Sequence, residues 1–281
     1  MILKKCALLV LFLCIINSIM VSHAAGFGRK HFAVYATAQD GIFFSKPQLN
    51  TVDFEKAEVR TVSYGEESHM EVGSFKFKVT LMLAFSTFLL MVVTIVLKNR
   101  SKNCVFFKAL TTICIISIAL LNYSGSEWFI LAGLIFSLVG DIFLEFERHF
   151  LHGMLAFFIT HVLYSVGFVK LFGIPNWWTF AGIYSIVLFQ YFFLKANLGR
   201  FKLTVLFYSL AIATMFSLSF GAMGSEIYPL RTLLPIGAAL FVLSDSCIAW
   251  DKFVKRLPLR NFLVLFTYFI GQLFIVLSIV T

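Results

Sequence analysis

The chain has 281 residues, of which 60% are hydrophobic, 17% aromatic and only 13% charged. A soluble domain of this length needs far more charge to cover its surface, so the composition excludes a soluble globular protein. The formal net charge of +9 does not indicate nucleic-acid binding, because most Lys and Arg residues flank apolar segments, where membrane proteins carry them.

Apolar runs recur from Val79 to the end of the sequence, and each is long enough to cross about 30 Å of hydrocarbon. In lipid the backbone must satisfy its own hydrogen bonds, so continuous apolar runs indicate helices. The sequence therefore predicts an all-α membrane protein with a bundle of about eight transmembrane helices. We place the spans at 79–97, 108–122, 127–146, 150–172, 177–195, 202–223, 232–250 and 260–280.

Residues 1–24 have the pattern of a signal peptide, with two lysines, an apolar stretch and small residues before Ala25. An uncleaved signal anchor is the alternative. Residues 25–75 form a separate, more acidic segment, which we expect to be a loosely structured lumenal or extracellular accessory segment. Residues 76–281 form the predicted membrane domain.

Basic residues predict the orientation of the bundle. Twelve Lys and Arg residues follow odd-numbered spans, whereas four lie at the opposite side. The positive-inside rule therefore places the odd connections in the cytoplasm. We expect a multi-pass protein of the endoplasmic reticulum, another endomembrane or the plasma membrane.

Two aspartates lie within predicted spans, Asp141 in the third and Asp245 in the seventh. Both spans run in the same direction, and each Asp is roughly 8 Å from the inner end at about 1.5 Å per residue. A charged group at a helix centre costs about 2.5–3.5 kcal/mol on insertion scales, which makes a functional role the default hypothesis. We expect the two carboxyls to face each other as catalytic residues; a hydrogen-bonded pair that only joins helices is the alternative.

Further polar residues are candidates for substrate binding. His161 and Tyr164 lie on the fourth span, where His161 could approach Asp141 within the hairpin or be a hydrogen-bonded core residue. Gln272 in the last span could bind a substrate oxygen or join helices. Glu145 shares a helical face with Asp141, and an interfacial carboxylate paired with Arg148 is its alternative. Ser244 and Ser246 flank Asp245.

Metal and nucleophile motifs are missing from the sequence. There is no G-x-S-x-G elbow, H-E-x-x-H motif or phosphate loop. His149 and His152 have a spacing that could share a metal, but no third ligand is evident, so we interpret them as interfacial. We expect neither a metal nor an organic cofactor.

Four segments resemble the YhhN family, which contains the lysoplasmalogenases. They occur in the family's order at residues 133–144 (GLIFSLVGDIFL), 153–164 (GMLAFFITHVLY), 243–253 (LSDSCIAWDKF) and 268–278 (YFIGQLFIVLS). The resemblance covers residues 79–281. It implies an eight-helix hydrolase that cleaves the vinyl ether of a lysophospholipid, releasing a fatty aldehyde and glycerophosphoethanolamine or glycerophosphocholine. The family's paired aspartates match Asp141 and Asp245.

The paired carboxyls also suit the hydrolysis of a vinyl ether when the family resemblance is left aside. Vinyl ethers hydrolyse by protonation at carbon, which forms an oxocarbenium ion that water captures. Close like charges resist double ionisation, so one carboxyl can supply the proton while the other stabilises the cation. The alternative is a non-enzymatic lipid-binding, receptor-like or transport protein that uses the same residues to hold a headgroup or a proton. In every case the expected partners are lipids of the membrane.

Overall fold

A computed structural model of the chain describes residues 66–98 and 104–280. Residues 71–281 form one compact unit. The predicted signal peptide (1–24) and most of the predicted accessory segment (25–75) lie outside the described residues.

The described residues form eight long helices joined by short connections, with no strand among them. The helices are α2 (Glu66–Leu97), α3 (Cys104–Leu121), α4 (Trp128–Phe143), α5 (Phe150–Phe172), α6 (Trp177–Leu194), α7 (Lys202–Ser219), α8 (Leu233–Phe253) and α9 (Arg260–Leu277). Short 3-10 segments lie at Glu147–His149, Lys195–Asn197, Gly199–Phe201 and Phe220–Gly224. Each predicted span coincides with one helix, which confirms the all-α fold.

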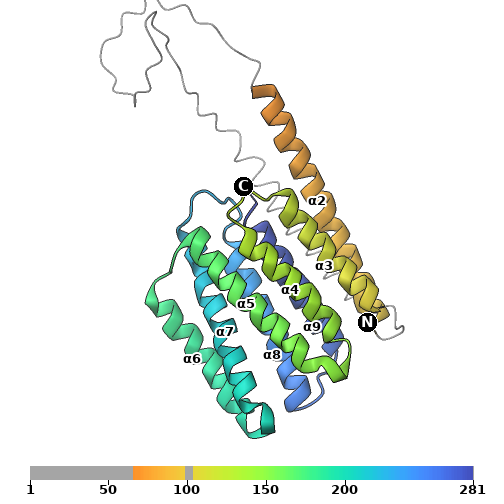
Figure 1. Ribbon diagram of the computed structural model, residues 1–281, viewed down its shortest axis with the longest axis vertical. Coiled ribbons are helices and arrows are strands. Elements are labelled where there is room, and N and C mark those ends of the chain that lie inside the picture. The colour runs from red at the N-terminus through yellow and green to blue at the C-terminus, as the bar shows by residue number, and fades with distance from the viewer. Residues whose placement is uncertain (1–65, 99–103, 281) are drawn as a thin grey trace, which may run out of the picture. The chain divides into compact units, whose positions relative to one another are not determined.

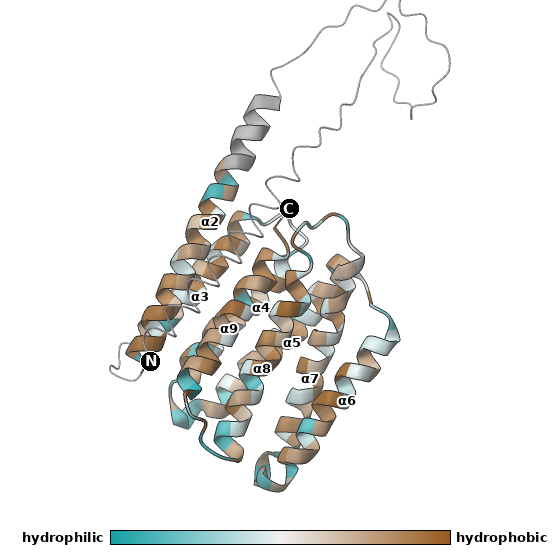
Figure 2. Cartoon of the chain, turned by 180° about the vertical axis from the view of Figure 1, so that it is seen from behind, coloured by the Kyte–Doolittle hydropathy of each residue, from teal (hydrophilic) through white to brown (hydrophobic). Residues whose placement is uncertain are grey.

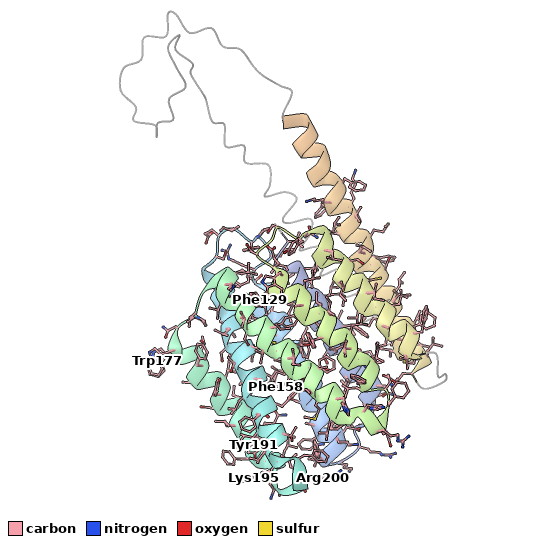
Figure 3. All side chains as sticks on the ribbon, viewed as in Figure 1. Phe129, Phe158, Trp177, Tyr191, Lys195 and Arg200 are labelled. Atoms are coloured by element: carbon pink, nitrogen blue, oxygen red, sulfur yellow. The ribbon has the colours of Figure 1, made fainter. Side chains whose placement is uncertain are left out.

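Seven of the helices in the described part are long and apolar enough to cross a membrane, and α4 is a shorter apolar helix of 16 residues. Successive helices run in opposite directions (Figure 1). Apolar residues cover most of the helix surfaces, and polar residues gather at the ends (Figure 2). Trp177 lies at one end of α6, whereas Lys195 and Arg200 lie at the other (Figure 3). The chain is therefore an integral multi-pass membrane protein.

Two boundaries differ from prediction in ways that affect the site. Helix α3 begins at Cys104 rather than at residue 108, so Lys108 lies inside the helix and is buried. Lys108 was one of the twelve basic residues counted after odd-numbered spans, and counting it there was wrong; the other eleven keep the same bias. Helix α4 ends at Phe143, and Glu145 lies in the turn that follows.

Small residues allow the closest helix contacts. In lipid there is little hydrophobic force between helices, so close packing holds them together. Helices α8 and α9 approach at Gly237 and Gly271, where a Cβ atom on either glycine would lie 2.7–2.8 Å from the backbone oxygen of the other. Helices α4 and α5 approach at Gly133, above which the ring of Tyr164 packs. These contacts fix two helix pairs that carry the polar residues.

Helices α6 and α9 differ most in burial. In α9, 67% of the apolar segment is buried within the structure, whereas in α6 only 22% of it is buried. Helix α9 therefore forms the centre of the bundle, and α6 lies at its edge (Figure 1).

Candidate active site

Asp141 lies in a polar cluster between α3, α4 and α9. Its side chain is 2% exposed, and Oδ1 lies 3.1 Å from the ammonium Nζ of Lys108 on α3. Oδ2 accepts hydrogen bonds from Thr112 and Tyr268, both at 2.8 Å. Both oxygens of this carboxylate thus have partners, an ammonium group for Oδ1 and two hydroxyl groups for Oδ2, as a buried charge requires.

Glu145 extends this cluster towards the end of the bundle. It forms ion pairs with Lys98 and, at 3.5 Å, with Lys108. Burial acts to raise the pKa of Glu145, but the nearby ammonium groups of Lys108 and Lys98 outweigh it, and the pKa is lowered. The predicted pairing with Arg148 was wrong, because the partners of Glu145 come from α3 and from the end of α2.

Gln272 joins three helices. Its Nε2 donates to Ser137 on α4 at 2.8 Å, and its Oε1 accepts a 2.5 Å hydrogen bond from Tyr164 on α5. Both Gln272 and Tyr164 are fully buried. Of the two roles expected for Gln272, the geometry favours the joining of helices.

Asp245 forms a second cluster with residues of α5 and α7. Tyr208 donates a 2.6 Å hydrogen bond to Oδ2 of Asp245, and Nε2 of His161 lies 3.3 Å from the same oxygen. Nε2 of His161 is also 3.1 Å from the Tyr208 hydroxyl. His161 is completely buried, whereas the Asp245 side chain is 14% exposed. The expectation that His161 approaches Asp141 was therefore wrong; its carboxyl partner is Asp245.

A partly open pocket of about 70 Å³ adjoins Asp245. Helices α5, α6, α7 and α8 line it, mostly with apolar side chains, and its polar lining includes Gln190, Tyr208, Asp245 and Ser246. Asp141 does not line it. Of the two aspartates, Asp245 is the one that a bound molecule in this pocket can reach.

Aromatic rings lie between the two clusters. The ring of His161 packs edge-on against Phe241 at 4.9 Å between centroids, and Phe241 packs against Tyr268 at 5.4 Å. Tyr268 in turn contacts Asp141. In the described part of the chain, no hydrogen bond or ion pair joins the two carboxyls directly.

The two serines beside Asp245 have different surroundings. Ser244 is buried and donates to the backbone oxygen of Val264 on α9 at 3.1 Å, which ties α8 to α9. Ser246 lines the pocket, where its hydroxyl donates to the backbone oxygen of Val242 at 2.7 Å and lies 3.1 Å from the side-chain amide of Gln190 on α6. The structure thus places Ser246, and not Ser244, where a ligand can contact it.

Sequence reasoning gave no role in the polar clusters to six of their residues: Lys98, Lys108, Thr112, Ser137, Tyr208 and Tyr268. A signal existed for Lys108 and Thr112, which are four residues apart and share one face of a mostly apolar helix. Tyr268 begins the fourth family-like segment, which was also a signal. Tyr208 has no comparable signal, since isolated tyrosines are common in apolar helices.

His149 and His152 have ring centroids 5.4 Å apart. Within the described residues, no group of three or more His, Cys, Asp or Glu side chains is arranged to hold a metal ion.

The fold and these clusters define a multi-pass membrane protein with ionisable residues buried between its helices. The model of the YhhN family matches residues 103–279, and the chain belongs to that family. Lysoplasmalogenase TMEM86A of Bos taurus is 35% identical over 159 residues, which are 54% of this chain and 65% of that protein. Lysoplasmalogenase TMEM86B of Mus musculus is 30% identical over 154 residues, covering 55% and 64%.

Lysoplasmalogenase TMEM86B of Homo sapiens is 32% identical over 179 residues, covering 61% of this chain and 73% of that protein. The chain spans just under two thirds of the length of the Bos taurus and Mus musculus relatives. No solved structure matches the chain significantly.

Proposed function

We propose that the protein is a lysoplasmalogenase-like ether hydrolase, which cleaves the vinyl ether bond of a lysoplasmalogen. The products are a fatty aldehyde and glycerophosphoethanolamine or glycerophosphocholine. The observation that carries this proposal is the position of Asp245, a carboxyl bonded to His161 and Tyr208 in the wall of an apolar pocket. The names of the relatives support the substrate class.

The reaction consumes one water molecule. An acid delivers a proton to the β-carbon of the vinyl ether, and the ether oxygen stabilises the resulting oxocarbenium ion. Water adds to the carbon attached to oxygen and loses a proton to a base, which gives a hemiacetal. The hemiacetal hydroxyl then loses its proton, the ether oxygen gains one, and the carbon–oxygen bond breaks to release aldehyde and alcohol.

The cluster around Asp245 has the groups that these steps need. A proton can be shared among the carboxyl, the imidazole of His161 and the phenol of Tyr208, because all three lie within hydrogen-bond distance of one another. Once the proton has moved to substrate, the carboxylate stabilises the cation, as carboxylates do for the related intermediates of glycosidases. Both described contacts use Oδ2, which leaves Oδ1 for the substrate.

We assign Asp141 a positioning role within the same proposal. Lys108 compensates its charge, and aromatic rings lie between it and the Asp245 cluster. Through Tyr268, Asp141 supports the ring of Phe241, on which His161 packs. On this assignment Asp141 is needed for turnover without contacting the substrate.

Turnover of a lysoplasmalogen by the purified protein, with released aldehyde as the readout, tests the proposal. Asp245→Asn keeps the shape of the side chain and removes the carboxylic acid, so turnover should fall at least about 100-fold. Asp251→Asn is the matched control, because Asp251 lies on the same helix and pairs with Arg260 at 2.8 Å, away from the pocket. Lipid binding without aldehyde release would instead indicate the non-enzymatic alternative.

A further inference from the structure

The pocket beside Asp245 continues along α8 to one end of the bundle. Asp245, Ala249 and Phe253 line it at intervals of four residues, so its wall follows one face of the helix. Lys252 comes about two helical turns after Asp245, within about 20° of the same face and about 10 Å further along the axis. Lys252 therefore lies beyond the apolar wall, at the end of the pocket.

Aromatic rings hold two cations at this end. Nζ of Lys252 lies 5.0 Å from the ring centroid of Phe150. The guanidinium carbon of Arg200 lies 5.1 Å from the ring centroid of Phe201. The Phe201 ring in turn packs against Phe150 at 6.5 Å and against Phe253 at 5.7 Å. Since Phe150 and Phe253 line the pocket, these rings place both cations at its end.

The turn that carries Arg200 is attached to the same pocket. Tyr191 lines the pocket and donates a hydrogen bond to the backbone oxygen of Lys202 at 3.3 Å. Arg200 precedes Lys202 by two residues, and it lies with Tyr191 at one end of the bundle (Figure 3). The hydrogen bond thus fixes this turn relative to the pocket lining.

Neither cation has an anionic partner in the part of the chain that the structure describes. Within residues 66–98 and 104–280, no carboxylate pairs with Lys252 or Arg200. The carboxylate next to Lys252, that of Asp251, pairs instead with Arg260 at 2.8 Å. Lys252 and Arg200 are exposed, and their long side chains can direct the charged groups towards an anion at the pocket end.

The spacing between Asp245 and Lys252 suits a glycerophospholipid. Five single bonds separate the ether oxygen on one terminal glycerol carbon from the phosphorus on the other, which is about 6 Å when extended. The flexible side chain of Lys252 covers the rest of the distance along α8. An ether held at Asp245 therefore brings the phosphate of the same molecule within reach of Lys252.

We propose that Lys252 and Arg200 form a phosphate subsite, which binds the headgroup phosphate of the substrate while the ether lies at Asp245. This inference rests on the proposed function, because the position of the reacting ether determines where the phosphate lies. Ammonium and guanidinium groups are the side-chain groups that bind phosphate most strongly. The lipid then lies with its headgroup at the basic end of the bundle.

The test compares two non-hydrolysable ligands, an alkyl ether of glycerophosphoethanolamine and the same alkyl glycerol without the phosphate. Wild-type protein should bind the phosphate ligand about tenfold more tightly, the scale of charge-assisted hydrogen bonds in a partly solvated site. Lys252→Gln should lower this ratio about threefold, and adding Arg200→Gln should abolish it. Lys252→Arg keeps the charge and should keep the ratio. Comparing ratios between variants cancels any difference in how the two ligands partition into micelles.

Lys255→Gln is the matched control, because Lys255 is exposed just after the same helix and does not line the pocket. An unchanged ratio in Lys252→Gln, an equal loss in Lys255→Gln, or no binding of either ligand by wild type would each overturn the proposal. Glycerophosphoethanolamine and inorganic phosphate should displace the lipid ligand only in large excess; displacement at equal concentration would overturn the assignment to a lipid headgroup. Because binding is measured without turnover, a protein that keeps the ratio but releases no aldehyde refutes the proposed function and not the subsite.

Discussion

The ion pair between Lys108 and Asp141 provides the sharpest test of how the two aspartates divide their roles. Asp141→Asn leaves the ammonium group of Lys108 buried with Glu145 as its remaining charged partner at 3.5 Å, beside the backbone oxygen of residue 141 at 3.4 Å. Both side chains of the original pair are at most 9% exposed, so solvent does little to screen the loss. Removing one partner of a buried pair costs about 3–5 kcal/mol of unfolding free energy.

Adding Lys108→Met to Asp141→Asn removes the second charge with an apolar side chain of similar length. Replacing both members of a buried ion pair is often neutral, so the double variant should regain most of the lost unfolding free energy. The amide introduced by Asp141→Asn would still accept a hydrogen bond from Tyr268, and Glu145 would keep Lys98 as its partner. If Asp141 only positions Tyr268, the double variant should also regain most of its turnover.

The measurements are a denaturant titration in mixed micelles and aldehyde release from a lysoplasmalogen, made on the single and double variants side by side. A double variant that is as stable as wild type yet at least about 100-fold slower would show that the Asp141 carboxyl itself takes part in the reaction. That result would refute the positioning role and favour the two-carboxylate mechanism expected from the sequence.

Three further predictions concern packing, charge and topology. Gly271→Ala places a Cβ atom 2.8 Å from a backbone oxygen of α8 and should cost about 1–3 kcal/mol in the same titration, whereas Gly182→Ala, with open space around it, should not destabilise. The ion pairs that lower the pKa of Glu145 stabilise the fold at neutral pH. Protonation of Glu145 removes this contribution as the pH falls through the lowered pKa. The stability difference between Glu145→Gln and wild type should therefore shrink in acid. In intact vesicles, a tag within residues 98–103, before helix α3, should be accessible from the cytoplasmic side, and a tag within 30–70 should be protected from protease there.

The helices could be predicted because each depends on local composition. A continuous apolar run in lipid has one means of satisfying its backbone, and each of the eight runs forms a helix. The two aspartates within spans were also recognisable, since placing a carboxyl within such a run costs free energy and therefore indicates a functional role or a compensating partner. Asp141 and Asp245 were identified for this reason.

The partners of these residues could not be predicted, because they depend on which helix faces are brought together. Asp141 meets Lys108 from the preceding helix α3 and Tyr268 from α9, 127 residues further along the chain. His161 faces α8 rather than the preceding helix α4. Asp141 and Asp245 were placed at the same depth in their helices, but equal depth does not determine the distance between the two carboxyls across the bundle. Lys108 was misplaced for the related reason that a lysine near a helix end resembles an interfacial residue.

The identity of each partner, more than depth in the membrane, distinguishes the two aspartates. Asp141 pairs with an ammonium group and accepts from two hydroxyl groups, and these contacts join α3, α4 and α9. Asp245 is bonded instead to an imidazole and a phenol, both of which can give or take a proton, and it borders an apolar pocket. The hydrolysis that we propose moves one proton onto carbon and another off water, and the groups around Asp245 suit these transfers. In the same proposal Asp141 has a positioning role, because its partner Tyr268 packs against Phe241, on which His161 packs.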